Sequence, residues 1–154
     1  MCLVIDTCAF PCVFDENSAE HARFAPIVEW LTVGRGKIIF GGSKYKDEIR
    51  GSVFRRILAE FDRRGKLVRV SDTKVDKLGK ELKKRVPDRN FNDEHIVALV
   101  ALTGCCVVCT DDKQAVPYLK RRDLYPRGVK PPKIYKRASH SSLCRNEHIV
   151  AACR

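Results

Sequence analysis

Long apolar runs are missing from this chain of 154 residues. No uninterrupted apolar stretch approaches the roughly 20 residues that a helix needs to cross a bilayer, so we expect no membrane association. The N-terminus also lacks a basic segment followed by an apolar stretch, and we therefore expect no secretory signal and a cytoplasmic protein. Aromatic residues make up only 8% of the chain and form no stripe of the kind that stacks nucleic-acid bases.

Acidic residues are scarce toward the C-terminus. Residues 119–154 carry ten basic and two acidic groups, a net charge of +8, whereas residues 1–118 carry 20 basic and 17 acidic groups, a net charge of +3. A basic flank on a nearly neutral body favours contact with a phosphate backbone, because nucleic acids release counterions when cationic side chains bind them. A solvated tail that wraps the domain would give the same composition.

Eight cysteines are present, at positions 2, 8, 12, 105, 106, 109, 144 and 153. Five of them lie within or beside apolar segments, and without an export signal we expect buried, reduced thiols and not a disulfide framework. Cys106 and Cys109 form a CxxC pair on a predicted strand, where residues three apart point to opposite faces. No second pair in the sequence completes a zinc site.

The alternation of apolar segments predicts an α/β fold. Strands are predicted at residues 2–5, 37–40, 67–70 and 105–109, with a candidate edge strand at 133–135. Helices are predicted at residues 19–33, 43–64, 72–85, 93–102 and 112–119, and a small terminal helix at 146–151. Strands that alternate with helices imply a mostly parallel central sheet covered on both faces, a three-layer α/β/α sandwich.

Carboxylates follow the predicted strands or open the predicted helices. Asp6 ends the first strand, and Asp111 and Asp112 follow the fourth. Asp93 opens one helix, and Glu48 lies in the first turns of another. Ligands of parallel α/β sheets bind at the carboxyl ends of the strands, and clustered carboxylates repel one another unless a cation lies among them. Hard oxygen ligands suit Mg²⁺ or Mn²⁺, so the pattern predicts a metal-dependent phosphodiesterase that acts on nucleic acid.

Four segments together resemble the PIN-domain ribonucleases, namely LVIDTCAF, YKDEI, FNDEHIVALVALTGC and VVCTDD. That family includes the toxins of bacterial toxin–antitoxin pairs and several RNA-processing nucleases. The resemblance implies a nuclease domain over residues 1–118, with residues 119–154 as a basic extension packed on or continuing it. It also implies an endoribonuclease that uses Mg²⁺ or Mn²⁺ and leaves a 5′-phosphate and a 3′-hydroxyl. An antitoxin and a second copy of the chain are the protein partners implied.

The resemblance assigns roles to individual residues. The catalytic acids are Asp6, Glu48, Asp93 and Asp112, the metal ligands are Asp6, Asp93, Asp111 and Asp112, and the supporting hydroxyls are Thr7 and Thr110. Asp111 is retained because it could share or take the role of Asp112. Only one of the consecutive residues Asp47 and Glu48 can face the site, and the family pattern favours Glu48. The candidate phosphate-binding cations, which flank the predicted cleft, are Lys44, Lys46, Arg50 and Arg89.

Each assignment has a structural alternative. Asp6 could cap a turn, Asp93 could cap its helix, and Glu48 could stabilise a helix dipole. His95 is expected to pack its helix, with an auxiliary ligand role as the alternative. For the whole chain, the alternatives are an RNA-maturation nuclease and a PIN-like scaffold that binds RNA without cutting it. A haloacid-dehalogenase-type phosphatase would need a second Asp where this chain has Cys8.

Overall fold

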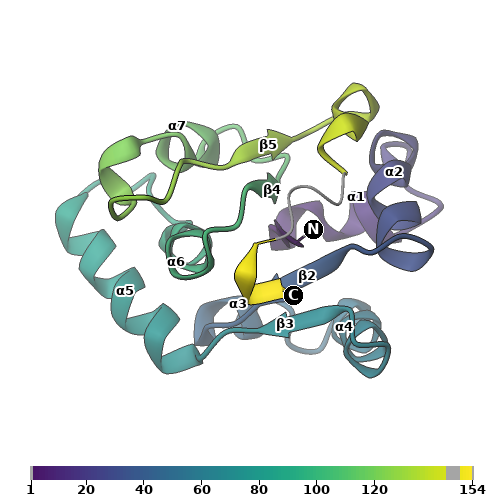
Figure 1. Cartoon of the computed structure of the whole chain (residues 1–154), viewed down its shortest axis with the longest axis horizontal. Coiled ribbons are helices and arrows are strands. Elements are labelled where there is room, and N and C mark those ends of the chain that lie inside the picture. The colour runs from purple at the N-terminus through teal and green to yellow at the C-terminus, as the bar shows by residue number, and fades with distance from the viewer. Residues whose placement is uncertain (1, 145–149, 154) are drawn as a thin grey trace.

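The structure, a computed structural model, describes residues 2–144 and 150–153 and is built around a sheet of five parallel strands (Figure 1). The strands are β1 (Cys2–Ile5), β2 (Lys37–Phe40), β3 (Leu67–Arg69), β4 (Val107–Cys109) and β5 (Lys133–Tyr135), in the order β3-β2-β1-β4-β5. All four residues of β1 and all three of β4 are buried, as expected for central strands covered on both faces. The predicted α/β fold and the edge strand at 133–135 are confirmed.

Helices cover both faces of the sheet. They are α1 (Phe10–Phe14), α2 (His21–Thr32), α3 (Ser43–Glu48), α4 (Val53–Arg63), α5 (Asp72–Arg85), α6 (Glu94–Thr103) and α7 (Ala115–Leu119). Short 3₁₀ turns occur at Thr7–Ala9, Arg122–Leu124, Ala138–Leu143 and Ala151–Cys153. In Figure 1, α5 and α6 lie on one side of the sheet and α2 and α4 on the other, which makes a three-layer sandwich. Within residues 2–144 and 150–153, no helix has the length and apolarity to cross a membrane.

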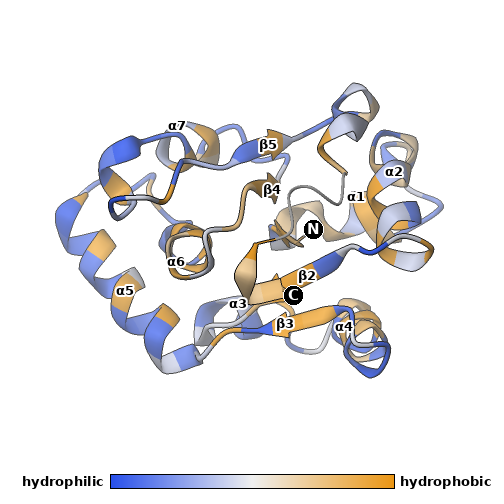
Figure 2. Ribbon diagram, in the orientation of Figure 1, coloured by the Kyte–Doolittle hydropathy of each residue, from blue (hydrophilic) through white to orange (hydrophobic). Residues whose placement is uncertain are grey.

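Helix α6 is buried on every side over its central two turns. Residues His95 to Ala101 are all buried, because α6 lies between α5 and the sheet. Figure 2 shows the difference in composition, with α6 largely hydrophobic and α5 mostly hydrophilic. A helix that is apolar all round is expected in such an inner position. Its end is fixed by Gly104, whose φ of +70° is a left-handed conformation that favours glycine.

The strand order creates a crevice at the carboxyl ends of β1 and β4. From β1 the chain moves outward to β2 and β3, and it then returns to place β4 on the other side of β1. The connection from β1 to β2 and the connection from β4 to β5 run in opposite directions along the sheet. Because such connections are right-handed, the segments that follow β1 and β4 lie on opposite faces of the sheet. Ligands of open α/β sheets bind at this switch point, so the residues that follow β1 and β4 are the candidate ligand-binding residues.

The helices of the structure differ from the prediction in two regions. The helix expected over 43–64 is two helices, α3 and α4, interrupted at residues 49–52, where Gly51 has a φ of +76°. Residues 7–14, for which no helix is expected, form a 3₁₀ turn followed by α1. Most of the other predicted elements agree with the structure to within about two residues at each end. The predicted terminal helix at 146–151 falls largely outside the described residues.

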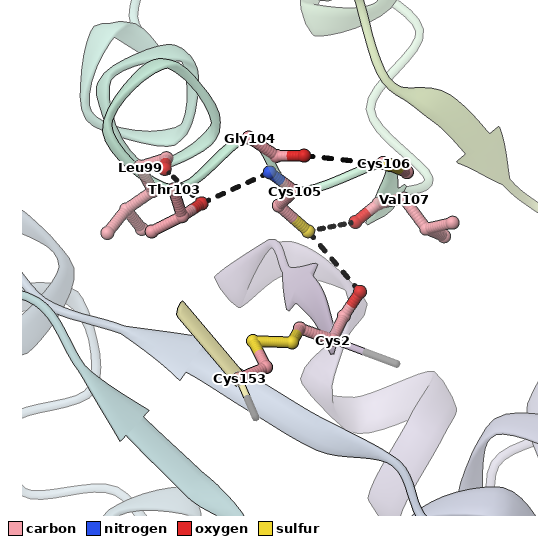
Figure 3. Close-up of a disulfide and its surroundings, with 8 residues drawn as sticks. All are labelled: Cys2, Leu99, Thr103, Gly104, Cys105, Cys106, Val107 and Cys153. Atoms are coloured by element: carbon pink, nitrogen blue, oxygen red, sulfur yellow. Dashed lines mark hydrogen bonds between the residues drawn. A yellow bond between two sulfur atoms is a disulfide. The ribbon is translucent and has the colours of Figure 1, made fainter. Parts of the chain in front are cut away.

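The expectation of reduced thiols is wrong for two cysteines. Cys2, the first residue of β1, and Cys153 form a disulfide with their Cα atoms 6.2 Å apart (Figure 3), a separation typical of disulfides. Both side chains are buried, because the C-terminal turn returns to the start of β1. The thiol of Cys105 lies 3.3 Å from the Cys2 carbonyl oxygen. The six other cysteines carry free thiols in the described part of the chain.

Candidate active site

The ends of β1 and β4 place Asp6 beside Thr110. In the parallel pairing of these strands Ile5 lies opposite Cys109, so the next residue of each strand leaves the sheet at the same edge. The backbone N–H of Asp6 donates to the Cys109 carbonyl at 2.8 Å, and the Thr110 hydroxyl donates to Asp6 Oδ2 at 2.7 Å. Asp6 is only 4% exposed and Thr110 is fully buried, so the hydroxyl fixes the carboxylate where little water competes.

The adjacent acids Asp111 and Asp112 point to different partners. The Asp112 backbone N–H donates to the Thr110 hydroxyl oxygen at 3.0 Å, and Asp112 Oδ1 accepts a hydrogen bond from the Gln114 N–H at 2.6 Å. The carboxylate of Asp111 is exposed and forms an ion pair with Arg23 of α2 at 3.3 Å. Asp112 is therefore held in the loop beside Asp6, while the charge of Asp111 is compensated by α2.

Asp93 lies within electrostatic reach of two other carboxylates. Burial and the charge of Asp6 raise the pKa of Asp93 to about 6, and Asp112 adds to the shift while His95 and Lys44 oppose it. Asp93 occupies the N-cap position of α6, but its side chain makes no capping hydrogen bond in the described chain. Helix capping therefore does not account for the half-buried charge of Asp93, and the structure gathers Asp6, Asp93 and Asp112 around one edge of the sheet.

Glu48 is held by a hydroxyl and lies close to an imidazole. The Thr7 hydroxyl donates to Glu48 Oε2 at 2.6 Å, and His95 Nε2 lies 3.6 Å from the same oxygen. Burial alone would raise the pKa of Glu48, but the neighbouring His95 and Thr7 outweigh it and leave that pKa below its ordinary value. The adjacent Asp47 pairs with Arg50 instead. Of these two consecutive acids, Glu48 is thus the one that contacts the loop after β1.

His95 is the residue whose environment the sequence does not reveal. It is 3% exposed, its ring packs edge-on against Tyr45 at 6.0 Å between centroids, and neither nitrogen has a hydrogen-bond partner among the described residues. Tyr45 in turn donates to the Ile5 carbonyl, which connects α3 to the end of β1. A groove of about 780 Å³ opens beside His95 between α3, α5 and α6, and its lining includes Lys44, Glu48, Lys80, Lys83 and Glu94. The only sequence signal for His95 is its spacing of two residues from Asp93.

The four candidate phosphate-binding cations do not lie together. Lys44 and Glu48 are four residues apart on α3, so they share a face and line the same groove. Lys46 and Arg50 lie on the opposite face of this segment and line a different pocket. Arg89 is exposed in the loop before α6. Lys46 and Arg50 therefore do not line the groove that contains Lys44 and Glu48, because residues two positions apart on a helix point to opposite sides.

The donor atoms at this edge suit a hard divalent cation in chemical type. They are carboxylate oxygens of Asp6, Asp93, Asp112 and Glu48, with hydroxyl groups behind them, and such oxygens are the ligands that Mg²⁺ and Mn²⁺ prefer. Within residues 2–144 and 150–153, however, no three or more acidic, histidine or cysteine side chains converge closely enough to enclose a metal ion. The carboxylates are near enough to repel one another without forming a closed ligand set.

Known proteins offer no guide to this site. No protein-family model, no curated protein and no solved structure matches the chain. The side chains at the carboxyl ends of β1 and β4 and their electrostatics are therefore the features from which a function can be inferred.

Asp93→Asn is expected to stabilise the metal-free protein at pH 7. The pKa of Asp93 is raised from 3.8 to about 6 on folding, so the folded state retains a proton that the unfolded state releases between these values. The free energy of unfolding therefore falls as the pH rises from about 4 to 6, because the carboxyl ionises more readily in the unfolded chain. Asparagine does not ionise, so the variant avoids this loss. Because the carboxylate is partly exposed, the gain in unfolding free energy should be on the order of 1 kcal/mol.

Urea unfolding in EDTA at pH 7 and at pH 4 measures this effect. We expect the full gain at pH 7 and a much smaller one at pH 4, where the folded carboxyl is protonated and the unfolded one, with its ordinary pKa of 3.8, is only partly ionised. Asp88→Asn is the matched control, because hydrogen bonds from Tyr118 and Asn90 lower the pKa of that exposed carboxyl and its loss should not stabilise. An Asp93→Asn gain of equal size at both pH values would contradict the electrostatic explanation.

Proposed function

We propose that this chain is a metal-dependent endoribonuclease of the PIN type. The observation that carries the proposal is that Thr110 holds Asp6 and the Asp112 backbone together at the switch point of the sheet, where the pKa of the nearby Asp93 is raised to about 6 by burial and by the charges of Asp6 and Asp112. Capping does not explain why the chain keeps these repelling carboxylates together. A strongly perturbed pKa in such a crevice is typical of functional sites, and a divalent cation would relieve the repulsion.

Each residue at this edge has a role in the proposal. Asp6, Asp93 and Asp112 would hold the cation, which when bound stabilises charge on the phosphate and activates a water molecule. Thr110 orients Asp6 through its 2.7 Å hydrogen bond, and Thr7 orients Glu48 through its 2.6 Å hydrogen bond. Asp111 is left out, because its carboxylate pairs with Arg23.

Lys44 is the cation best placed to bind a substrate phosphate. Its charge lowers the pKa of Asp93, so it lies close to the proposed catalytic acids, and its ammonium group forms an ion pair with Glu94 at 3.0 Å. The groove of about 780 Å³ that it lines also contains Lys80 and Lys83 of α5, and its acidic lining residues are Asp47, Glu48, Asp76 and Glu94. A nucleic-acid strand in this groove would place a backbone phosphate near Asp93. The preference for RNA, the antitoxin and the homodimer remain proposals that depend on the family resemblance.

Cleavage of RNA should require added metal. We expect an unstructured RNA to be cut internally in the presence of Mn²⁺ or Mg²⁺ and to remain intact in EDTA, because the carboxylates alone cannot neutralise the charge that develops on the phosphate. The new 5′ ends should carry phosphate, which a 5′-phosphate-dependent exonuclease detects. Binding of RNA without any cleavage in either metal would favour the scaffold alternative, and equal cleavage in EDTA would contradict the metal-dependent mechanism.

A further inference from the structure

A second pocket lies on the other face of α3 from the candidate active site. It has a volume of about 450 Å³ and is formed where α3, α4 and the turn between them meet β2 and β3. None of its lining residues contributes to the groove that contains Glu48 and His95. The volume lies within the range of small-molecule binding sites, which is roughly 300–1,000 Å³.

The charged side chains of this pocket are all cationic. Lys46, Arg50, Arg55 and Arg69 contribute to its lining, and no acidic residue does. Three of these cations pair with carboxylates that lie outside the lining, namely Asp72, Asp47 and Asp62. Arg55, in contrast, forms no ion pair within the described chain. The pocket therefore presents one uncompensated guanidinium and three cations whose exposed ion pairs contribute little energy and exchange readily.

The rest of the pocket is apolar. Ala59 is exposed and Leu67 is partly exposed, whereas Phe40 and Leu58, at 6% and 3% exposure, contribute only small parts of the pocket surface. The Lys46 ammonium lies 6.0 Å from the centre of the Phe40 ring, so cation and aromatic surface occur side by side. An apolar surface flanked by cations on one side fits a ligand with a flat, weakly polar body and an anionic end.

We propose that this pocket binds a nucleoside 5′-phosphate. The phosphate would contact Arg55 and its neighbouring cations, which supply planar donors for bidentate hydrogen bonds. The base would lie against the accessible apolar lining at Ala59 and Leu67, since every base has a π face that packs on apolar side chains. Inorganic phosphate alone would leave the apolar surface unfilled, and a nucleoside alone would leave the Arg55 guanidinium without an anionic partner. The site is separate from the carboxylates of the proposed nuclease and does not need a metal ion.

Titration calorimetry with adenosine 5′-monophosphate in EDTA tests this inference. The mononucleotide should bind the wild-type chain with a Kd below about 1 mM, and adenosine and inorganic phosphate should each bind at least about tenfold more weakly. Because EDTA removes divalent metal, binding under these conditions is independent of whether the chain cleaves RNA. No detectable heat from the mononucleotide at millimolar concentration, or equal binding of inorganic phosphate, would overturn the proposal.

Two adjacent arginines of α4 provide a matched pair of variants. Arg55→Gln should weaken mononucleotide binding about tenfold or more, the effect of losing one charge-assisted hydrogen bond. Arg56 is also exposed but does not line the pocket, so Arg56→Gln should change the affinity less than about twofold. Equal losses in the two variants would show only nonspecific attraction to a basic surface and would overturn the proposal.

A short oligonucleotide distinguishes two sources of the ligand. If a strand with a 5′-phosphate binds as tightly as the mononucleotide and its 5′-hydroxyl counterpart does not, the pocket holds the end of a nucleic-acid strand. If only the mononucleotide binds, the pocket takes free nucleotides. Both results uphold the site, whereas equal binding of the phosphorylated and unphosphorylated strands would contradict recognition of a terminal phosphate.

Discussion

Asp6→Asn is expected to lower the rate of metal-dependent RNA cleavage by about 10²- to 10³-fold, the scale found when one preorganised electrostatic group is lost from an active site. Asp6 is the most buried of the four acids, and it lies at the junction of β1, β4 and α6. Asparagine has the same shape, but it removes the negative charge that a divalent cation needs. Single-turnover cleavage of a labelled RNA in Mn²⁺ measures the loss.

The fold should survive this change. The asparagine carbonyl oxygen could still accept the hydrogen bond that Thr110 donates to Asp6 in the wild-type chain at 2.7 Å, so circular dichroism and the unfolding midpoint should remain close to wild type. Asp123→Asn is the control, because that exposed carboxylate pairs with Arg121 away from the groove and its loss should alter the rate by less than about threefold. Full cleavage by a folded Asp6→Asn variant would rule out the proposed mechanism.

Cys153→Ser is expected to destabilise the oxidised protein by up to about 5 kcal/mol. The disulfide joins residues 151 positions apart, and in the chain-entropy view a cross-link over so long a loop restricts the unfolded chain strongly, with typical effects of about 2–5 kcal/mol. Urea unfolding without reductant should show the loss in the unfolding free energy. In the presence of reductant, wild type and variant should differ much less, because both then lack the bond.

A thiol count and a second variant make this prediction decisive. Denatured protein without reductant should expose six thiols and reduced protein eight, as the pairing of Cys2 with Cys153 requires. Cys144→Ser removes a partly buried cysteine that has a free thiol, and its effect should be the same with and without reductant. Eight thiols in the protein as purified from an oxidising buffer would contradict the bond.

Much of the fold could be predicted from the sequence, because apolar periodicity reports burial directly. The short apolar segments at β1, β2, β3 and β4 and the helical spacing of α2, α5 and α6 gave the layers. The break between α3 and α4 could not be predicted in this way. Ile49, Val53, Ile57 and Phe61 keep a four-residue spacing across it, and the positive φ of Gly51 interrupts the helix without disturbing that pattern.

The candidate site was predictable only where strand ends determine position. Asp6 and Thr110 are neighbours because the register of two parallel strands puts them there. The contact of His95 with Glu48 depends on how α3 packs near α6, which no local pattern reports. Proximity in sequence was misleading for Lys46, since a helix turns it toward β3 and away from the acids. The Cys2–Cys153 pairing depends on where the last turn of the chain docks, and cysteine spacing cannot give that.

The two outermost strands of the sheet bear on how the protein behaves at high concentration. β3 and β5 are each three residues long, and each contains a cation, Arg69 in β3 and Lys133 in β5. Short, charged borders offer few free peptide groups to an incoming strand and repel an identical border on another copy. The short, charged edge strands therefore oppose aggregation through edge-to-edge strand pairing, while the central strands β1 and β4 remain buried.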